Sequence, residues 1–242
     1  MEPKGINFAA MPQTAINVVT KPAEFFQEMP KTGGFPEPLI FAVIMGLIAG
    51  IIQAILGFIG LGHAGGYDGG VMGSFSVIIF MPIAAAIGSF IGAAIFFVIW
   101  KLMGSQENYE TAFRCGAYLM ALSPITSIVG VVPYAGGIIT MAIYIFYIVT
   151  ASIHVHHIPS QKAWLVFGII GIVFGAIGLF SEYKIRHMAS SMDQWRQRGE
   201  EYRKSARDMG KSSEEIRQQA EKMVEQLKEQ AEEAKRQAQR NR

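Results

Sequence analysis

The sequence predicts an all-α membrane protein: a polytopic bundle of five transmembrane helices, followed by a long C-terminal amphipathic helix of the coiled-coil type. Two observations support this fold class. Long apolar runs alternate with short polar segments, and 51% of the 242 residues are hydrophobic while 17% are charged. The charges are also segregated, because 15 of the 21 Lys and Arg residues and 11 of the 19 Asp and Glu residues lie from Lys184 onward. A chain divided in this way is expected to occupy two solvents, one of which is lipid.

The charge boundary also predicts three domains: an N-terminal segment with a short interfacial helix (1–37), a five-span domain (38–181) and a charged helical tail (182–242). The body before Lys184 carries 6 basic and 8 acidic side chains, a net charge of −2, and the tail nets +4 from 15 and 11. Such nearly balanced charge does not form the basic surface that phosphates need, so no nucleic-acid partner is expected. Cys115 is the only cysteine, which excludes an intrachain disulfide.

The first element expected is a short helix in the N-terminal segment. Residues 1–20 are weakly patterned and are expected to form a flexible or surface segment. A helix bounded by Pro22 and Pro30 follows, with Phe25 and Phe26 on its apolar face. Two interpretations stay open: a helix that lies in the membrane interface, and a surface helix that packs on its own domain.

Five apolar runs come next, each long enough to cross a hydrocarbon core of about 30 Å as a helix. A charged segment separates the second run from the third, with Trp100 and Lys101 at its start and Arg114 where the chain returns into the membrane. Pro82 predicts a tilt or bend in the long second run, because proline removes a backbone donor. The expected spans are Pro38–Gly62, Val71–Trp100, Cys115–Val132, the run from the tight turn at 133–137 to Ile153, and Ala163–Phe180.

The distribution of basic residues predicts the orientation of the bundle. The first and third loops contain no Lys or Arg. By the positive-inside rule the N-terminus and the other two loops are cytoplasmic, and an odd number of spans places the tail on the opposite side. Lys184 and Arg186, just past the last span, favour the cytoplasmic side for the tail instead. The basic residues that support a cytoplasmic N-terminus are Lys4, Lys21, Lys31, Lys101, Arg114 and Lys162.

Small residues at four-residue spacing predict where the spans pack together. Lipid offers no hydrophobic drive between helices, so their association depends on close backbone approach. Ridges of small residues occur in the first, second and fifth spans, although glycine is also common in membrane helices generally. The ridges are Gly46 and Gly50; Ala84, Gly88 and Gly92; and Gly171 and Gly175.

The tail has a heptad period in which apolar and small residues alternate at steps of four and three. Ala, Gly and Ser fill much of this seam, so three interpretations stay open: a self-associating coil, a helix docked on a partner or on the membrane, and a solvated, frayed helix. The predicted partners are the lipid bilayer and, through the tail, another protein or a second copy of the chain. The larger seam residues are Met192, Trp195, Tyr202, Met209, Ile216, Met223 and Leu227.

Residues for catalysis or metal binding do not occur in a recognisable arrangement. No Asp or Glu falls inside an expected span, so the ionisable groups of most ion-coupled transporters are missing. The GxSxG and HExxH strings do not occur. His154, His156 and His157 have no neighbouring carboxylate or thiol in the sequence, which favours a membrane interface over a metal site. No cofactor, metal or enzymatic activity is predicted.

Three segments resemble a known family: KPAEFFQEM before the first span, KLMGSQENYETAFRCGAYLMALSP in the middle, and YIFYIVTASIHVHHIPSQKAW before the last span. In their order and spacing they resemble the Yip domain (Ypt/Rab-interacting protein) family over residues 20–180. The resemblance implies a five-span bundle with a cytoplasmic N-terminus and, for eukaryotic members, a role in vesicle trafficking with small GTPases. The family pattern marks five positions to test first: Phe25, Gly104, Arg114, Tyr118 and Pro124.

Two departures from the family pattern bear on function. The chain has almost no N-terminal cytosolic region, and it adds the tail over residues 182–242. The compact form resembles bacterial members, for which the cytoplasmic membrane is the expected location. We therefore expect a non-enzymatic scaffold, organiser or accessory subunit in membrane assembly or trafficking. The alternative is a channel or transporter for ions or small molecules, with a polar pore lined by Gln53, Ser123, Thr126 and Thr140.

Overall fold

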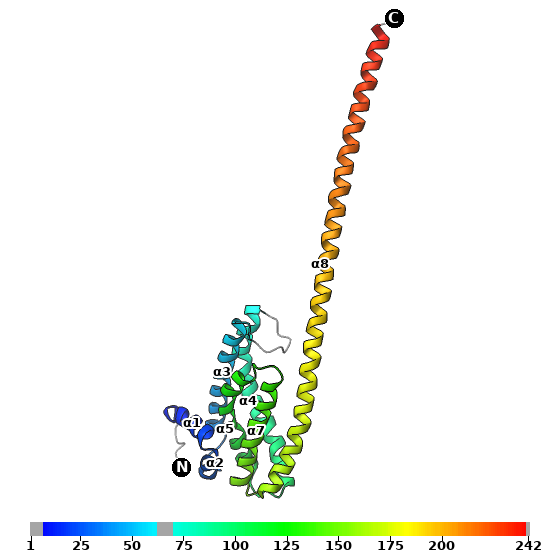
Figure 1. Ribbon diagram of the computed structural model, residues 1–242. Coiled ribbons are helices and arrows are strands. Elements are labelled where there is room, and N and C mark those ends of the chain that lie inside the picture. Colours follow the sequence, from blue (N-terminus) through cyan, green and yellow to red (C-terminus); the bar gives the residue numbers. More distant parts are fainter. Residues whose placement is uncertain (1–6, 62–69, 241–242) are drawn as a thin grey trace. The chain divides into compact units, whose positions relative to one another are not determined.

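The computed structural model describes residues 7–61 and 70–240, and every regular element in these ranges is a helix. The chain divides into two compact units, Met1–Arg186 and His187–Arg242, which are treated separately. Figure 1 follows the helices from the N-terminus. They are η1 (Phe8–Ala10), α1 (Met11–Thr20), α2 (Pro22–Glu28), α3 (Pro36–Phe58), α4 (Gly70–Leu102), α5 (Tyr109–Leu119), η2 (Met120–Leu122), α6 (Ser123–Val129), α7 (Ala135–His154) and α8 (Ser160–Arg240).

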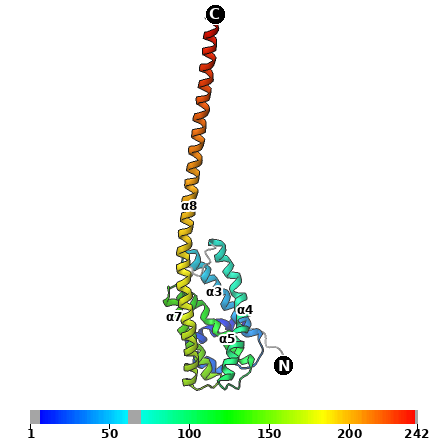
Figure 2. The ribbon, with the colours of Figure 1, turned by 90° about the vertical axis from the view of Figure 1, so that its right-hand side faces the viewer.

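Within the described part of the first unit, five helical segments are long and apolar enough to cross a membrane. This finding confirms the predicted all-helical fold with five candidate spans. In both views α3 and α4 run side by side in opposite directions, and α5 packs against both of them (Figures 1 and 2). The segments are Pro36–Phe58, Phe75–Leu102, Tyr109–Val129, Ala135–His154 and Ser160–Ile185.

The interface between α3 and α4 depends on two glycines of the first span. A Cβ atom on Gly46 would lie 2.6 Å from the Cβ atom of Ala85, and one on Gly50 would lie 3.0 Å from the Cβ atom of Met81. The carbonyl oxygens of Met81 and Val77 lie 3.1 Å from the same two positions. Any side chain here would push the helices apart, so glycine permits the close backbone approach that membrane helices need.

The small-residue ridge expected on α4 lies one residue away from the buried face. Ala85 and Ser89 are 4% and 6% exposed, whereas Ala84 is exposed. Apart from the neighbouring backbone of α4 itself, the Cβ positions of Gly88 and Gly92 have no atom within 4 Å among the described residues. The prediction that Ala84, Gly88 and Gly92 pack against another span therefore needs correction. Small residues occupy two adjacent registers of this helix, and the shape of α3 decides which of them is buried.

Of the two glycines predicted to pack in the fifth span, one lies in a packed part of α8 and the other in an open part. Gly171 lies against Ile145 of α7, with whose side chain an added Cβ would collide. Gly175, about one turn later, has no described atom within 4 Å of its Cβ position, which corrects the prediction for this residue. Ala163 and Phe167 are buried as well. The span thus packs on the bundle through its first turns and is more exposed after Gly171.

The third span begins earlier than expected, at Tyr109 rather than Cys115. Asn108 caps α5, because its side chain accepts a hydrogen bond from a backbone N–H of the first turn. Arg114 therefore lies inside the helix and is 1% exposed. The 3₁₀ turn η2 precedes α6, and Pro124 occupies the first turn of α6, where a missing N–H is tolerated.

Of residues 1–20, expected to form a flexible or surface segment, the structure describes 7–20, and α1 forms there; residues 1–6 lie outside the described residues. Val18 of α1 and Phe26 of α2 are completely buried. Tyr147 on α7 donates a hydrogen bond to the carbonyl oxygen of Val19 at 2.6 Å. Both short helices therefore pack on the bundle, and for α2 this packing agrees with the second of its two interpretations. The sequence pattern of residues 11–20 did not predict this helix, and tertiary packing supplies what the local pattern lacks.

The second unit, as far as it is described, is the part of α8 from His187 onward. The side chains of Met192, Ile216 and Leu227 lie outside the described set, so the heptad seam stays a prediction. The other four larger seam residues are well exposed: Trp195 at 70%, Tyr202 at 77%, Met209 at 69% and Met223 at 64%.

Candidate functional site

A polar cluster occupies the end of the bundle where α3, α5 and α8 begin and α4 and α7 end. We call it the charged end, defined by Lys31, Glu107, Glu110 and Arg114. Lys31 Nζ forms an ion pair with Glu107 Oε1 at 2.7 Å. The backbone N–H of Gly34 donates to Glu110 Oε1 at 2.6 Å, and Arg114 Nη1 donates to the carbonyl oxygen of Gly34 at 2.9 Å. These contacts attach the segment that connects α2 to α3 both to α5 and to the loop that precedes α5.

The guanidinium of Arg114 is the most buried charge of this cluster. Its Nη2 atom lies 3.6 Å from Glu37 Oε2, and its Cζ atom lies 5.9 Å from the ring centre of Tyr118. Its Nε atom is buried and has no hydrogen-bond partner among the described residues. A buried guanidinium needs several partners to offset its desolvation, and here α3, α5 and the loop before α3 supply them together.

Trp100 and His156 form the core of the charged end. Their rings stack with centroids 3.9 Å apart, and both residues are buried. Trp100 Nε1 donates to Ser152 Oγ at 2.7 Å, and Ser105 Oγ is hydrogen-bonded to His156 Nδ1 at 2.8 Å. The indole is thus covered by protein and connects α4 to α7.

Protonation at the charged end follows from burial and from the ion pair. Burial lowers the pKa of His156 from 6.5 to about 4, although the Glu107 carboxylate partly opposes this shift. Burial alone would raise the pKa of Glu107, but its hydrogen bond and charge interaction with Lys31 outweigh that effect and hold its pKa below the usual value. At neutral pH the cluster thus contains a neutral imidazole beside an ionised carboxylate.

The three neighbouring histidines do not come together as a ligand set. His156 is buried against Trp100, and His157 has a backbone φ of +53° after the end of α7. Over residues 7–61 and 70–240, no group of three His, Cys, Asp or Glu side chains could hold a metal ion. His154 forms the last turn of α7.

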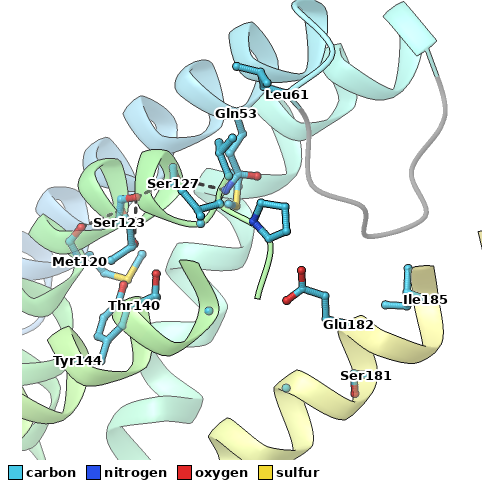
Figure 3. Close-up of a pocket in the computed structure, with 18 of the residues that line it drawn as sticks. Gln53, Leu61, Met120, Ser123, Ser127, Thr140, Tyr144, Ser181, Glu182 and Ile185 are labelled. Atoms are coloured by element: carbon cyan, nitrogen blue, oxygen red, sulfur yellow. Dashed lines mark hydrogen bonds between the residues drawn. The ribbon is translucent and has the colours of Figure 1, made fainter. Parts of the chain in front are cut away.

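A second feature lies at the opposite end of the bundle, where α3 and α6 finish and α7 begins. It is a cavity of about 920 Å³ lined by residues of α3, α4, α6, α7 and α8, and we call it the embedded cavity. In Figure 3 Ser123, Thr140 and Tyr144 stand on one side of it, and Ser181 and Glu182 of α8 stand on the other. The four residues expected to line a polar pore all line this cavity: Gln53, Ser123, Thr126 and Thr140.

Most hydrogen-bond donors in the embedded cavity are used within the protein. Ser123 Oγ donates to the carbonyl oxygen of Met120 at 2.7 Å, and Ser127 Oγ donates to that of Ser123 at 2.8 Å. Gln53 Nε2 donates to Ser127 Oγ at 3.3 Å and so joins α3 to α6. Thr140 differs, because its Oγ1 atom is buried and has no hydrogen-bond partner in the described structure.

A comparison of the sequence with models of known protein families found a match. A family model described as the Yip1 domain matches residues 16–181. The chain belongs to the Yip1 domain family. The matched residues include α2 and reach into the fifth span, so the tail lies outside the Yip1 domain. Together with the five apolar helices, this membership identifies an integral membrane protein. Comparisons with curated proteins and with solved structures found no match.

Three of the five predicted motif residues meet inside the Yip1 domain. The ring of Tyr118 lies 5.2 Å from that of Phe25, edge to face, and Arg114 lies over it. The other two residues lie elsewhere. Gly104 has a φ of +101° after the end of α4, a conformation that favours glycine, and Pro124 lies beside α1 in an apolar groove. The contact between Phe25 and Tyr118 thus joins the N-terminal segment to the third span.

Sequence reasoning missed two parts of the site. Trp100, Ser105, Ser152 and His156 are far apart in the sequence, and no local spacing marks their contact. The wall that α8 contributes to the embedded cavity was missed because Glu182 lies beyond the expected end of the fifth span. The only sequence signal was the charge itself: Glu182 directly follows an apolar run.

Proposed function

We propose that this Yip1-domain protein is a non-enzymatic membrane organiser, in which the bundle is the anchor and the tail of α8 contacts a partner. The observation that carries this proposal is the row of exposed large apolar side chains in the tail. Trp195, Tyr202 and Met209 follow one another at seven-residue spacing, and Met223 continues the row two heptads later. A helix face of this kind is stabilised when it is covered, by about 1.5–3 kcal/mol for each large side chain that becomes fully buried.

Arginines border this apolar row on both sides and indicate the chemistry of the partner. Arg203 directly follows Tyr202, and Arg217 directly follows the seam position Ile216. Arg198 lies on the other flank, with its guanidinium 5.9 Å from the Trp195 ring. In a parallel pair of identical tails, Arg198 of one copy would face Arg203 of the other, which is repulsive. A partner helix with acidic residues beside its own apolar seam therefore fits this surface better than a second copy.

Site-specific photo-crosslinking in native membranes tests the proposal. A photoreactive amino acid replaces Tyr202 in the row, and the matched control replaces Lys204 on the opposite side of the same helix turn. We expect a protein adduct at position 202 at least fivefold more abundant than at position 204. Mass spectrometry then identifies whether the adduct is a second copy or another protein. Equal labelling at both positions would contradict the proposal.

We also propose that the protein lies in a bacterial cytoplasmic membrane with its N-terminus in the cytoplasm. Lys31, Lys101 and Lys162 gather at the charged end, as the positive-inside rule requires of a cytoplasmic face. In a chain with Cys115→Ala, single cysteines replacing Glu24 and Tyr134 report the two ends of the bundle. A membrane-impermeant maleimide added outside spheroplasts is expected to label position 134 and not position 24. The reverse pattern would invert the orientation.

A second candidate function is passage of ions or small molecules, because the four predicted pore residues line one cavity. Leu122 is buried in the bundle between that cavity and the charged end, and Trp100 and Arg114 are buried at the charged end itself. This packing favours the organiser over the channel. Flux assays in proteoliposomes discriminate the two, since a channel requires tracer release above that of protein-free vesicles.

A further inference from the structure

We propose that the embedded cavity binds a membrane-soluble, uncharged amphiphile: a molecule with an apolar body and a head group that carries hydroxyl or amide functions. This inference does not depend on the organiser proposal, since it concerns the bundle and not the tail. It follows from the size of the cavity, from the chemistry of its lining and from one buried hydroxyl group without a partner.

The size of the cavity suits a ligand. Its volume of about 920 Å³ falls near the upper end of the range for small-molecule sites, which is roughly 300–1,000 Å³. It forms where α8 becomes exposed after Gly171, so small residues of α8 such as Gly178 and Ser181 complete the wall. A helix packed along its whole length would have filled this space.

The polar lining can recognise an uncharged head group. Ser123 and Ser127 donate their hydroxyl protons to backbone carbonyls, and Ser127 Oγ also accepts a hydrogen bond from Gln53 Nε2, so the Ser123 oxygen keeps its accepting capacity for a ligand. Thr140 Oγ1 is buried without a partner among the described residues. Buried polar atoms are nearly always hydrogen-bonded, and a ligand hydroxyl or amide supplies the partner that Thr140 lacks.

The charge of the lining selects against ionic head groups. The described lining contains no Lys, Arg or His, and its one acidic residue is Glu182, which accepts a hydrogen bond from Tyr134 N at 3.0 Å. A phosphate head group would meet a carboxylate and no cation. A metal ion would find a single carboxylate, which is too few for a stable site.

The remaining lining suits an apolar body. Met81 and Met120 line the cavity, and flexible methionines adapt to ligands of irregular shape. Leu61, Val131 and Val132 line the end that lies away from the charged end. The outer face of α8 next to the cavity carries exposed apolar residues such as Phe174 and Ile177, so a bilayer is the source of the ligand.

Photolabelling of the full-length protein in nanodiscs tests this inference. The probe is a monoacylglycerol with a diazirine in its acyl chain. The test variant is Thr140→Val, which removes only the unpartnered hydroxyl, and the control is Thr150→Val on the same helix but outside the cavity. We expect labelling of α6 and α7 in the parent and the control. In Thr140→Val we expect labelling about fivefold weaker, the loss of one hydrogen bond.

Competition and stability measurements complete the test. Unlabelled monoacylglycerol is expected to compete with the probe, whereas lysophosphatidic acid of the same chain length is not. Thr140→Val is expected to melt at or above the temperature of the parent, so that weaker labelling does not reflect misfolding. Equal labelling of Thr140→Val and Thr150→Val, or equal competition by both lipids, would show ordinary boundary lipid and overturn the inference.

Discussion

The two ends of the bundle are built in opposite ways. At the charged end Trp100, Arg114 and Ser152 are almost completely buried, and each makes a direct polar contact with another element. At the other end the helices leave a cavity of about 920 Å³ between them. One end thus holds the helices together through paired polar groups, and the other leaves room between them. We therefore expect the charged end to be the stable base of the bundle, and the cavity end to tolerate substitutions.

Removing the buried guanidinium is expected to have the largest effect on stability. Arg114→Leu leaves the carbonyl oxygen of Gly34 without its donor and Glu37 without its cation, at a cost of about 3 kcal/mol. Lys101→Leu, an exposed cation at the same end, is expected to change stability by less than about 0.5 kcal/mol. Thermal unfolding in detergent measures both. Similar melting temperatures for the two variants would show that the charged end is not the stable base.

Two glycine substitutions separate a packed helix face from an open one. Gly46→Leu forces a side chain against Ala85 of α4 and is expected to cost about 2 kcal/mol or prevent assembly. Gly88→Leu is expected to be nearly neutral, because no described atom lies within 4 Å of its Cβ position. Expression level and melting temperature report the difference. If Gly88→Leu destabilised the protein and Gly46→Leu did not, the assignment of the buried face of α4 would be reversed.

Acidification is expected to weaken the charged end through His156. The pKa of this residue is 6.5 when unfolded and about 4 when buried, so its contribution is fully present above pH 6.5 and is lost as the pH falls toward about 4. At about pH 5 the loss amounts to about 2 kcal/mol. The fall in melting temperature between about pH 7 and about pH 5 measures it, and His156→Gln should flatten that dependence. An unchanged slope in this variant would assign the effect to another group.

The smallest expected effects come from one substitution made at each end. Ser152→Ala removes the acceptor of Trp100 Nε1 and leaves a buried donor unpaired, at a cost of about 1–2 kcal/mol. Ser181→Ala at the mouth of the embedded cavity is expected to cost less than about 0.5 kcal/mol, because this residue is exposed. Guanidinium- or heat-induced unfolding compares the pair. Equal losses would remove the distinction between the two ends.

Hydropathy predicted the number of spans because it tests a local condition. Each helix makes its own backbone hydrogen bonds in lipid, so only its own apolar side chains decide whether it can cross. The packed face of a span is a different matter. On α4 the residues Ala84, Ala85, Gly88 and Ser89 are all small, and only contact with Gly46 of α3 decides that Ala85 is buried. Periodicity alone does not contain that information.

The site was predicted in part for the same reason. Gln53, Ser123, Thr126 and Thr140 stood out as polar residues within apolar runs, and the structure brings all four to one cavity. The stacking of Trp100 on His156 joins segments that have no common pattern in the sequence. Long-range contacts between single side chains leave no periodic signal, so they appear only once the bundle is assembled.

The burial of Val18 and Phe26 has a practical consequence for any shortened form of the chain. A protein that started at Pro36 would keep every transmembrane segment yet expose the surfaces of α5 and α7 that α1 and α2 cover. Its Tyr147 hydroxyl would also lose the carbonyl group of Val19. The smallest stable Yip1 domain of this chain thus starts well before its first crossing, and trimming to hydropathy boundaries would yield an aggregation-prone fragment.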